Sequence, residues 1–391
     1  MSDSNFLILT CDGGGIRGLI TAMIIQELDK KVPFLNRIDL FSGTSTGGII
    51  ALGLASGVPI SKLVNVYSSS GNCSTIFTPY KPQSHRVPGF WEKFIKNLDK
   101  SEEFAGIAGI LESIDQLLYV KYDNTGLKTV LENNLTQPSN SLAELNRKVL
   151  VTTFQLHNVS DKNNPSSRSI TLPAPLNWKE IQRKKTYSAM PVQNNPSWRP
   201  ITLDNLPNNK FQSQDTLILD AALCTSAAPT YFPPYQHPRY GLCVDGGVFA
   251  NNPSTLTLAR VLGSGILGKR NIQNIRMLSV GTGTTQSYLP PSYQPDGPLR
   301  YGPTTWLWPE AIGNTPRVPL LAILMDGSSI LDDFQVEMLL PDQHYKRMNI
   351  QLTESIPLDG CAKVRDMEGL VKSYIGSPEW QEAIKWVENN F

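Results

Sequence analysis

The chain has 391 residues, enough for one large domain or two ordinary ones with a sizeable buried core. Hydrophobic residues make up 40% and charged residues 18%, which is typical of a soluble globular protein. The formal net charge of +1 gives no overall field that would attract nucleic acid or an anionic membrane, so we expect no nucleic-acid polymer as a partner.

The N-terminus and the cysteines bear on where the protein works. We find no secretory signal, no lipidation motif and no run near the roughly 18 apolar residues of a membrane-spanning helix. The five cysteines are scattered without a CxxC pair, and each is interpreted as a buried thiol. These features predict a reducing, cytoplasmic location. The cysteines are Cys11, Cys73, Cys224, Cys243 and Cys361.

The first half of the chain predicts strands that alternate with helices. Residues 5–11 form an apolar strand, a glycine loop follows, and apolar residues then recur at helical spacing over 19–28. A second unit has a strand at 38–41, a turn at 42–48 and an apolar helix at 49–55. Residues 102–135 are expected to be mostly helical with a break at 122–125, and 148–154 to be a β-branched strand.

The second half begins with a change of composition. Residues 158–214 are rich in Asn, Pro, Ser and Lys, and they predict a long loop-rich insertion. We then expect a helix at 217–227, strands at 240–244 and 275–280, a loop at 284–304 and a final helix. That helix should begin with Ser377 as N-cap and Pro378 at its first position. The alternation indicates an α/β fold with a mainly parallel sheet.

The first chemical motif is the loop from Gly13 to Gly18, with the sequence GGGIRG. Such a loop offers backbone N–H groups beside a helix N-terminus, which suits any anion, whether a pyrophosphate or a transient oxyanion. As a dinucleotide site it would need an acidic residue about 20 residues further on, a position that Asp39 nearly fills. A plain glycine turn is the third interpretation.

The second and third motifs are Gly43-Thr44-Ser45-Thr46-Gly47 and Asp245-Gly246-Gly247. The first is a G-x-S-x-G sequence between a strand and a helix, the setting of a nucleophile elbow, and the helix would direct its positive end at Ser45. The second places a carboxylate at a strand end, which by itself is a common turn. We expect a parallel sheet to bring the two strand ends to one edge.

Taken together, the three motifs resemble the patatin-like phospholipase family, in which a DGGGxRG loop, a GxSxG serine and a DGG or DGA aspartate occur in this order. The stretches 123–127, 225–234, 246–253 and 278–283 also look familial, and 325–348 resembles the C-terminal part of bacterial and plant members. The resemblance predicts a patatin-like catalytic domain over 5–285, including the unmatched insertion 158–214, and a C-terminal extension over 286–391 packed on the same domain.

The resemblance implies a three-layer α/β/α fold and hydrolysis of ester bonds in acyl lipids, with no cofactor and no metal. It assigns Ser45 as nucleophile and Asp245 as base. Gly13, Gly14 and Gly15 would form the oxyanion hole, and Arg17 would bind the lipid phosphate or another anion. Gly18, Gly43, Gly47, Gly246 and Gly247 complete the motifs.

Several alternatives stay open at this point. A catalytic triad would need one of the four histidines, His85, His157, His237 or His344, of which His344 stands in a helix-like charged stretch. A nucleotide-binding protein with GGGIRG as its phosphate loop is the other functional class. The resemblance implies a membrane phospholipid or glycerolipid as partner and therefore peripheral contact with the membrane, with 158–214 or Trp306 and Trp308 at the docking edge. A small-molecule activator such as a cyclic nucleotide is neither predicted nor excluded.

Overall fold

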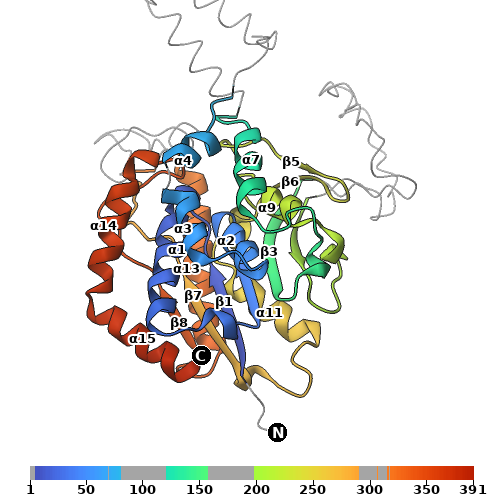
Figure 1. Ribbon diagram of the computed structural model, residues 1–391, viewed down its shortest axis with the longest axis vertical. Coiled ribbons are helices and arrows are strands. Elements are labelled where there is room, and N and C mark those ends of the chain that lie inside the picture. The colour runs from blue at the N-terminus through green and yellow to red at the C-terminus, as the bar shows by residue number, and fades with distance from the viewer. Residues whose placement is uncertain are drawn as a thin grey trace, which may run out of the picture.

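The computed structural model describes residues 5–68, 70–80, 120–156, 198–289, 306, 315–316 and 318–391. Eight strands form one sheet in the spatial order β5-β6-β3-β2-β1-β7-β8, and β4 pairs with β3 outside this path (Figure 1). The strands are β1 (Phe6–Cys11), β2 (Leu40–Gly43), β3 (Lys148–Gln155), β4 (Arg199–Asp204), β5 (Tyr235–His237), β6 (Gly241–Asp245), β7 (Ile275–Val280) and β8 (Tyr345–Met348).

The centre of the sheet is parallel and its flank beyond β3 is antiparallel. β1 pairs in parallel with β2 and β7, β2 with β3, and β7 with β8. β3 pairs antiparallel with both β4 and β6, and β6 with β5. The parallel centre matches the sequence, because β1 and β2 are buried along their whole length and contain almost no charge.

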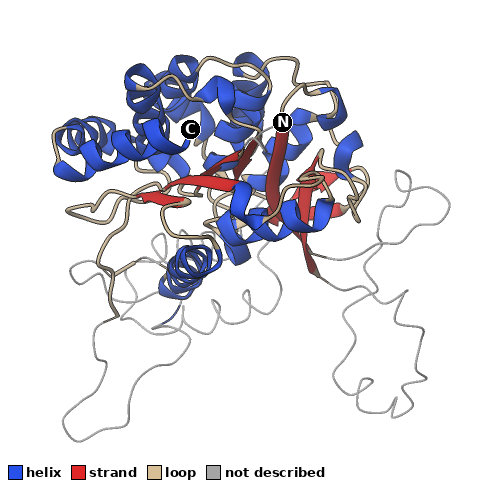
Figure 2. Ribbon diagram, turned by 90° about the horizontal axis from the view of Figure 1, so that it is seen from below, coloured by secondary structure: helices blue, strands red, loops and turns tan. Residues whose placement is uncertain are grey.

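Helices cover both faces of the sheet, so the fold is the expected three-layer α/β/α arrangement (Figure 2). Side chains alternate along β1: Leu7 and Leu9 join one hydrophobic core, while Phe6 and Ile8 join the other. The larger core packs against α1 (Gly18–Lys31), α2 (Thr46–Ala55), α3 (Ile60–Ser68), α4 (Ser70–Ile76), α7 (Thr125–Asn134), α9 (Ile218–Thr225), α14 (Val364–Ile375) and α15 (Pro378–Asn390). The smaller core packs against α11 (Ser254–Ser264) and α13 (Pro319–Leu339), and α10 (Gly247–Ala250) lies next to α13.

Most predicted elements are confirmed within a few residues, and two are wrong. The predicted insertion contains the strand β4, whose Ile201 and Leu203 are buried against β3. The sequence did not predict this strand because Pro200 and neighbouring polar residues interrupt its hydrophobic pattern. β4 has only one partner strand, and such a strand tolerates proline and needs little hydrophobic patterning. His344 is not helical either, since it stands in the turn before β8. Residues 81–119, which hold the start of the predicted helical region, lie outside the described residues.

The C-terminal residues contribute directly to the sheet and its helical layer. β8 extends the sheet beside β7, and α14 packs against α1 (Figure 1). α15 begins as predicted, with the Ser377 hydroxyl accepting a hydrogen bond from the Trp380 amide at 3.2 Å and Pro378 in the first turn. The domain boundary at residue 285 stays a prediction.

The cysteines correct one expectation. Cys73 of α4 and Cys361 form a disulfide across 288 positions of sequence, whereas Cys11, Cys224 and Cys243 are buried thiols as expected. A pair so distant in sequence leaves no spacing signal. Cys73 and Cys361 are therefore not the free thiols that were expected, and the cytoplasmic location stays a prediction. Within the described part of the chain, we find no helix long and apolar enough to cross a bilayer.

Candidate active site

Ser45 occupies a sharp turn between β2 and α2. Its backbone has φ 54° and ψ −124°, a conformation that non-glycine residues rarely adopt. A Cβ atom on Gly43 would lie 2.1 Å from the Gly47 carbonyl oxygen, and one on Gly47 would lie 2.2 Å from the Cys11 carbonyl oxygen. The two glycines of G-x-S-x-G are thus required by close backbone contacts. As the N-cap of α2, Ser45 stands at the positive end of that helix.

The glycine loop connects β1 to α1 and runs beside Ser45. The Gly13 amide donates to the Asn251 carbonyl at 3.0 Å, so it is already engaged in a backbone hydrogen bond. Within the described residues, no acceptor is assigned to the amides of Gly14 and Gly15. A Cβ on Gly14 would lie 2.3 Å from the Thr282 hydroxyl oxygen, and Gly15 has φ +57°. Of the three predicted oxyanion donors, the Gly13 amide is thus engaged with a backbone acceptor, and the roles of Gly14 and Gly15 stay a prediction.

A buried ion pair anchors the start of this loop. The Arg347 guanidinium of β8 donates two hydrogen bonds to the Asp12 carboxylate, one of them at 2.8 Å, and a further one to the Ser279 hydroxyl at 2.8 Å. Asp12 keeps the pKa of Arg347 above its ordinary value against the burial that would lower it. No sequence signal indicated a role for Asp12, Arg347 or Asn251, although Asp12 directly precedes the glycine loop and Asn251 lies within 246–253.

Asp245 is the last residue of β6, and its carboxylate lies beside Ser45. Asp245 is only 3% exposed, and its carboxylate accepts a hydrogen bond from the Gly247 amide at 2.7 Å. Burial raises the pKa of Asp245 to about 7, while the nearby Ser45 hydroxyl and the Gly247 amide counteract part of that rise. A Cβ on Gly246 would lie 2.0 Å from the Thr152 hydroxyl oxygen, which explains the glycine after the aspartate.

The route by which Asp245 arrives differs from the prediction. β6 is antiparallel to β3, so it does not run toward the carboxyl edge in the same direction as the parallel strands. Instead, Asp245 pairs with Thr153, two residues beyond Val151, which pairs with the last residue of β2, Gly43. β6 therefore runs in the opposite direction to the parallel strands, and its last residue, Asp245, lies at the level of Ser45 at their carboxyl ends.

The described histidines lie elsewhere. His237 Nδ1 accepts from the amides of Arg239 and Tyr240, and burial lowers the pKa of His237 to about 4. His344 contacts Arg276, and neither histidine lines the pocket that contains Ser45. His85 and His157 lie outside the described residues.

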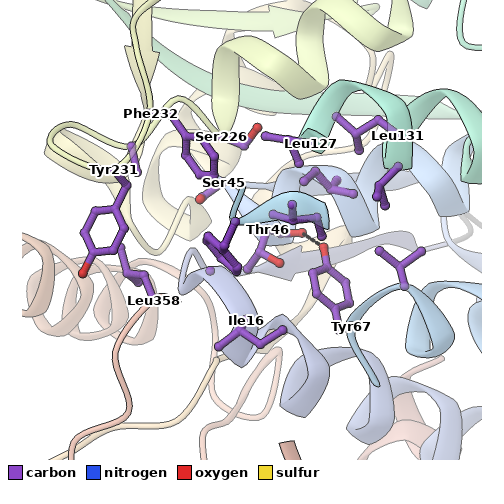
Figure 3. Close-up of a pocket in the computed structure, with 17 residues that line it drawn as sticks. Ile16, Ser45, Thr46, Tyr67, Leu127, Leu131, Ser226, Tyr231, Phe232 and Leu358 are labelled. Carbon is purple, nitrogen blue, oxygen red and sulfur yellow. Dashed lines mark hydrogen bonds between the residues drawn. The ribbon is translucent and has the colours of Figure 1, made fainter. Parts of the chain in front are cut away.

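Two cavities flank the glycine loop. The first is a narrow apolar pocket behind Ser45, bounded by α2, α3, α4 and α7 (Figure 3). Its wall includes Ile16, Leu127, Leu131, Phe232 and Leu358. The second, of about 760 Å³, lies on the α13 side of the loop.

Arg17 lies at the second cavity. Its guanidinium donates weakly to the carbonyls of Gly14 at 3.4 Å and Gly283 at 3.3 Å. No ion pair found among the described residues includes Arg17. Burial lowers the pKa of Arg17, and the charge of Asp326 counteracts this. Asp326 and Asp333 also line this cavity, and anion binding by Arg17 stays a prediction.

The position of Asp39 speaks against a dinucleotide site. A ribose-binding acid would stand at the carboxyl end of β2, next to the glycine loop. Asp39 instead precedes β2 and accepts from the Leu7 amide at 2.8 Å, at the opposite end of the strand. The carboxyl end of β2 leads into the Ser45 turn.

The structure combines an α/β/α fold with a strained serine turn and an adjoining apolar pocket. Sequence comparison identifies the family to which the chain belongs. The profile described as "Patatin-like phospholipase" matches residues 9–258, and the chain belongs to this family. It is 28% identical over 279 residues to a cGAMP-activated phospholipase of Pseudomonas aeruginosa, which corresponds to 71% of this chain but only 62% of that protein. It is 25% identical over 389 residues to Patatin-like protein 2 of Arabidopsis thaliana, covering 91% and 77% of the two chains.

Proposed function

We propose that this protein is a lipid acyl hydrolase that cleaves carboxylic ester bonds of phospholipids or related glycerolipids through a Ser45–Asp245 dyad. The observation that carries the proposal is the buried Asp245 carboxylate beside Ser45, whose pKa is raised to about 7 by burial although its interaction with the Ser45 hydroxyl lowers that pKa. Such a carboxylate is a far stronger base than an exposed aspartate, so it needs no histidine between itself and the serine.

In the first half of the reaction, Asp245 takes the proton of the Ser45 hydroxyl while the serine oxygen attacks the ester carbonyl. The tetrahedral intermediate collapses to an acyl-enzyme as Asp245 returns the proton to the departing alcohol. In the second half, Asp245 takes a proton from water, which attacks the acyl-enzyme. Fatty acid leaves and Ser45 recovers its proton.

The oxyanion is assigned to the amides of Gly14 and Gly15, because the Gly13 amide is engaged with Asn251. A single donor of this kind typically lowers the barrier by about 2.7–4 kcal/mol. Gly13 then serves to hold the loop in place. The Asp12–Arg347 pair supports the same loop from the neighbouring strands.

The two cavities suit the two ends of a lipid. The apolar pocket behind Ser45 would take the acyl chain, since its lining is almost entirely hydrocarbon and aromatic (Figure 3). The cavity with Arg17 would take the head group, with the guanidinium facing a phosphate. Relatives from Pseudomonas and Vibrio are described as cGAMP-activated, so titration with cGAMP is a direct test for a small-molecule activator here.

The proposal is tested with Ser45→Ala, Asp245→Asn and the double variant on a soluble ester and on dispersed phospholipid. We expect each single variant to eliminate turnover and the double variant to be no worse than either. A fluorophosphonate probe should label the wild type and not Ser45→Ala.

The control is His237→Gln, which changes a histidine away from Ser45 and should keep the rate within a few-fold of wild type, provided the variant folds. Wild-type-like turnover by Asp245→Asn would refute the dyad. A collapse of turnover in a well-folded His85→Gln or His157→Gln variant would replace the dyad with a triad.

A further inference from the structure

Helix α13 presents its apolar side chains to solvent. Of its 21 residues only Pro319 and Val336 are buried, although the helix packs against α10 and α11. Its exposed apolar side chains follow one another at helical spacing and form what we call the α13 apolar face. They are Leu320, Ile323, Leu324, Ile330, Leu331, Phe334, Met338 and Leu339, which are between 42% and 71% exposed.

The inward side of α13 is held largely by polar contacts. The Ser329 hydroxyl accepts from the side-chain amide (Nδ2) of Asn251 at 3.0 Å, and the Asp332 carbonyl accepts from the Thr255 hydroxyl at 3.0 Å. Asp333 accepts from the Tyr345 hydroxyl at 2.6 Å. The orientation of the helix is therefore fixed by specific hydrogen bonds, and an apolar patch of this size on a soluble protein marks a contact surface.

The charged residues of α13 indicate which kind of partner surface could cover the α13 apolar face. α13 contains no lysine or arginine, and two of its four acidic residues, Asp332 and Asp333, are only partly exposed. An anionic membrane would gain no attraction from such a surface. A bilayer of zwitterionic or uncharged lipids matches it, because such a bilayer offers hydrocarbon without a net charge.

The α13 apolar face adjoins the proposed active site. The Met325 methyl group lies 3.2 Å from the position that a Cβ on Gly247 would occupy, two residues after Asp245. Ile323 and Asp326 line the same cavity as Arg17. A lipid that left a bilayer beneath α13 would thus enter the cavity that leads to the glycine loop.

We propose that the α13 apolar face is the surface by which this protein docks on a bilayer of uncharged or zwitterionic lipid, with α13 lying in the plane of the interface. This inference rests on the proposed function. It differs from the docking segments predicted from sequence, of which 158–197 and Trp308 lie outside the described residues.

The test compares the triple variant Leu331→Gln, Phe334→Gln, Met338→Gln with wild type. Glutamine preserves helix propensity while removing the apolar contact. Leu217→Gln is the matched control, because Leu217 is a 38% exposed leucine beside α9 in the opposite helical layer. Flotation with phosphatidylcholine vesicles should show partitioning at least about tenfold weaker for the triple variant and unchanged for the control.

Hydrolysis of vesicle lipid should fall with binding, while hydrolysis of a short soluble ester should stay at the wild-type rate. Added phosphatidylserine should not strengthen wild-type binding. Unchanged flotation of the triple variant would overturn the proposal. If wild type hydrolyses no ester at all, the proposed function fails, and flotation still decides whether α13 docks.

Two other occupants of the face give distinct results, and either would overturn the proposal. A second copy of the chain would make wild type a dimer by light scattering in the absence of lipid, and the triple variant a monomer. Coverage by another part of the same chain would show as a monomer whose melting temperature falls in the triple variant.

Discussion

Asp245 shows how burial turns an ordinary carboxyl group into a catalytic candidate. In water an aspartate is too weak a base to accept a serine proton efficiently, but the enclosed position at the end of β6 raises its pKa to about 7. The sequence predicted the residue, because the Asp-Gly-Gly turn is a local pattern. It could not predict the pKa shift, which comes from the residues packed around the carboxyl group.

The pH dependence of turnover follows from this shift. The base acts only when deprotonated, so kcat/KM on a soluble ester should rise with pH through about 7 and level off above it. Initial rates between pH 5 and pH 9 measure this. A profile that stays flat down to pH 5 would mean that no group with such a pKa acts as base.

The same burial should cost stability. Because the pKa of Asp245 is higher in the folded state than the ordinary value of 3.8, this group destabilises the fold increasingly as pH rises from about 4 to 7. Asp245→Asn should therefore stabilise the protein at pH 8, by up to about 4 kcal/mol, and much less at pH 4. Urea unfolding at both pH values measures the difference. Asp215→Asn, at a residue with 73% side-chain exposure, is the control expected to change little.

At the level of elements, the Ser45 turn depends on backbone packing between β1, β2 and α2. Both glycines of the G-x-S-x-G sequence lie against main-chain atoms, which cannot move aside as a flexible side chain could. The contact of Gly43 with Gly47 is local in sequence, whereas Gly47 lies against Cys11 and Asp12 of the preceding strand and loop. The G-x-S-x-G pattern nevertheless predicted the turn.

Gly47→Ala tests that packing. The new methyl group would lie 2.2 Å from the Cys11 carbonyl oxygen and 2.5 Å from that of Asp12, so we expect a loss of stability of several kcal/mol or no folded protein. Gly263→Ala in α11 is the control, because nothing lies within 4 Å of its added methyl group. That variant should be more stable by about 0.5–1 kcal/mol. Thermal unfolding of the two variants compares them, and equal stabilities would contradict the expected packing.

At the level of the whole molecule, the C-terminal part is tied to the candidate site. The Leu358 carbonyl accepts from the Ile16 amide at 2.8 Å beside the glycine loop, and Leu358 also lines the apolar pocket. Three residues later, Cys361 is joined to Cys73 of α4, the helix that ends at Ile76 in the same pocket. The disulfide thus connects two walls of the pocket.

Replacing both cysteines should loosen this connection. The double variant Cys73→Ser, Cys361→Ser should be less stable by about 2–4 kcal/mol, since the bond restricts a long loop in the unfolded chain. Dithiothreitol should lower the melting temperature of wild type to a similar extent and leave the double variant unchanged. A wild type that does not respond to the reductant would contradict the prediction.

The amino-acid sequence by itself determined the parallel centre of the sheet, the turn at Ser45, the glycine loop and the aspartate turn. These depend on hydrophobic periodicity and on short motifs whose residues are contiguous in the sequence, although the close contacts of their glycines mostly involve distant residues such as Thr282, Leu358 and Thr152. Only the tertiary structure decided the antiparallel approach of β6, the engagement of the Gly13 amide, the Asp12–Arg347 pair, the disulfide and the outward apolar face of α13. Each of these features depends on which distant parts of the chain pack against the residues concerned. Such long-range partners produce no periodic pattern in the sequence.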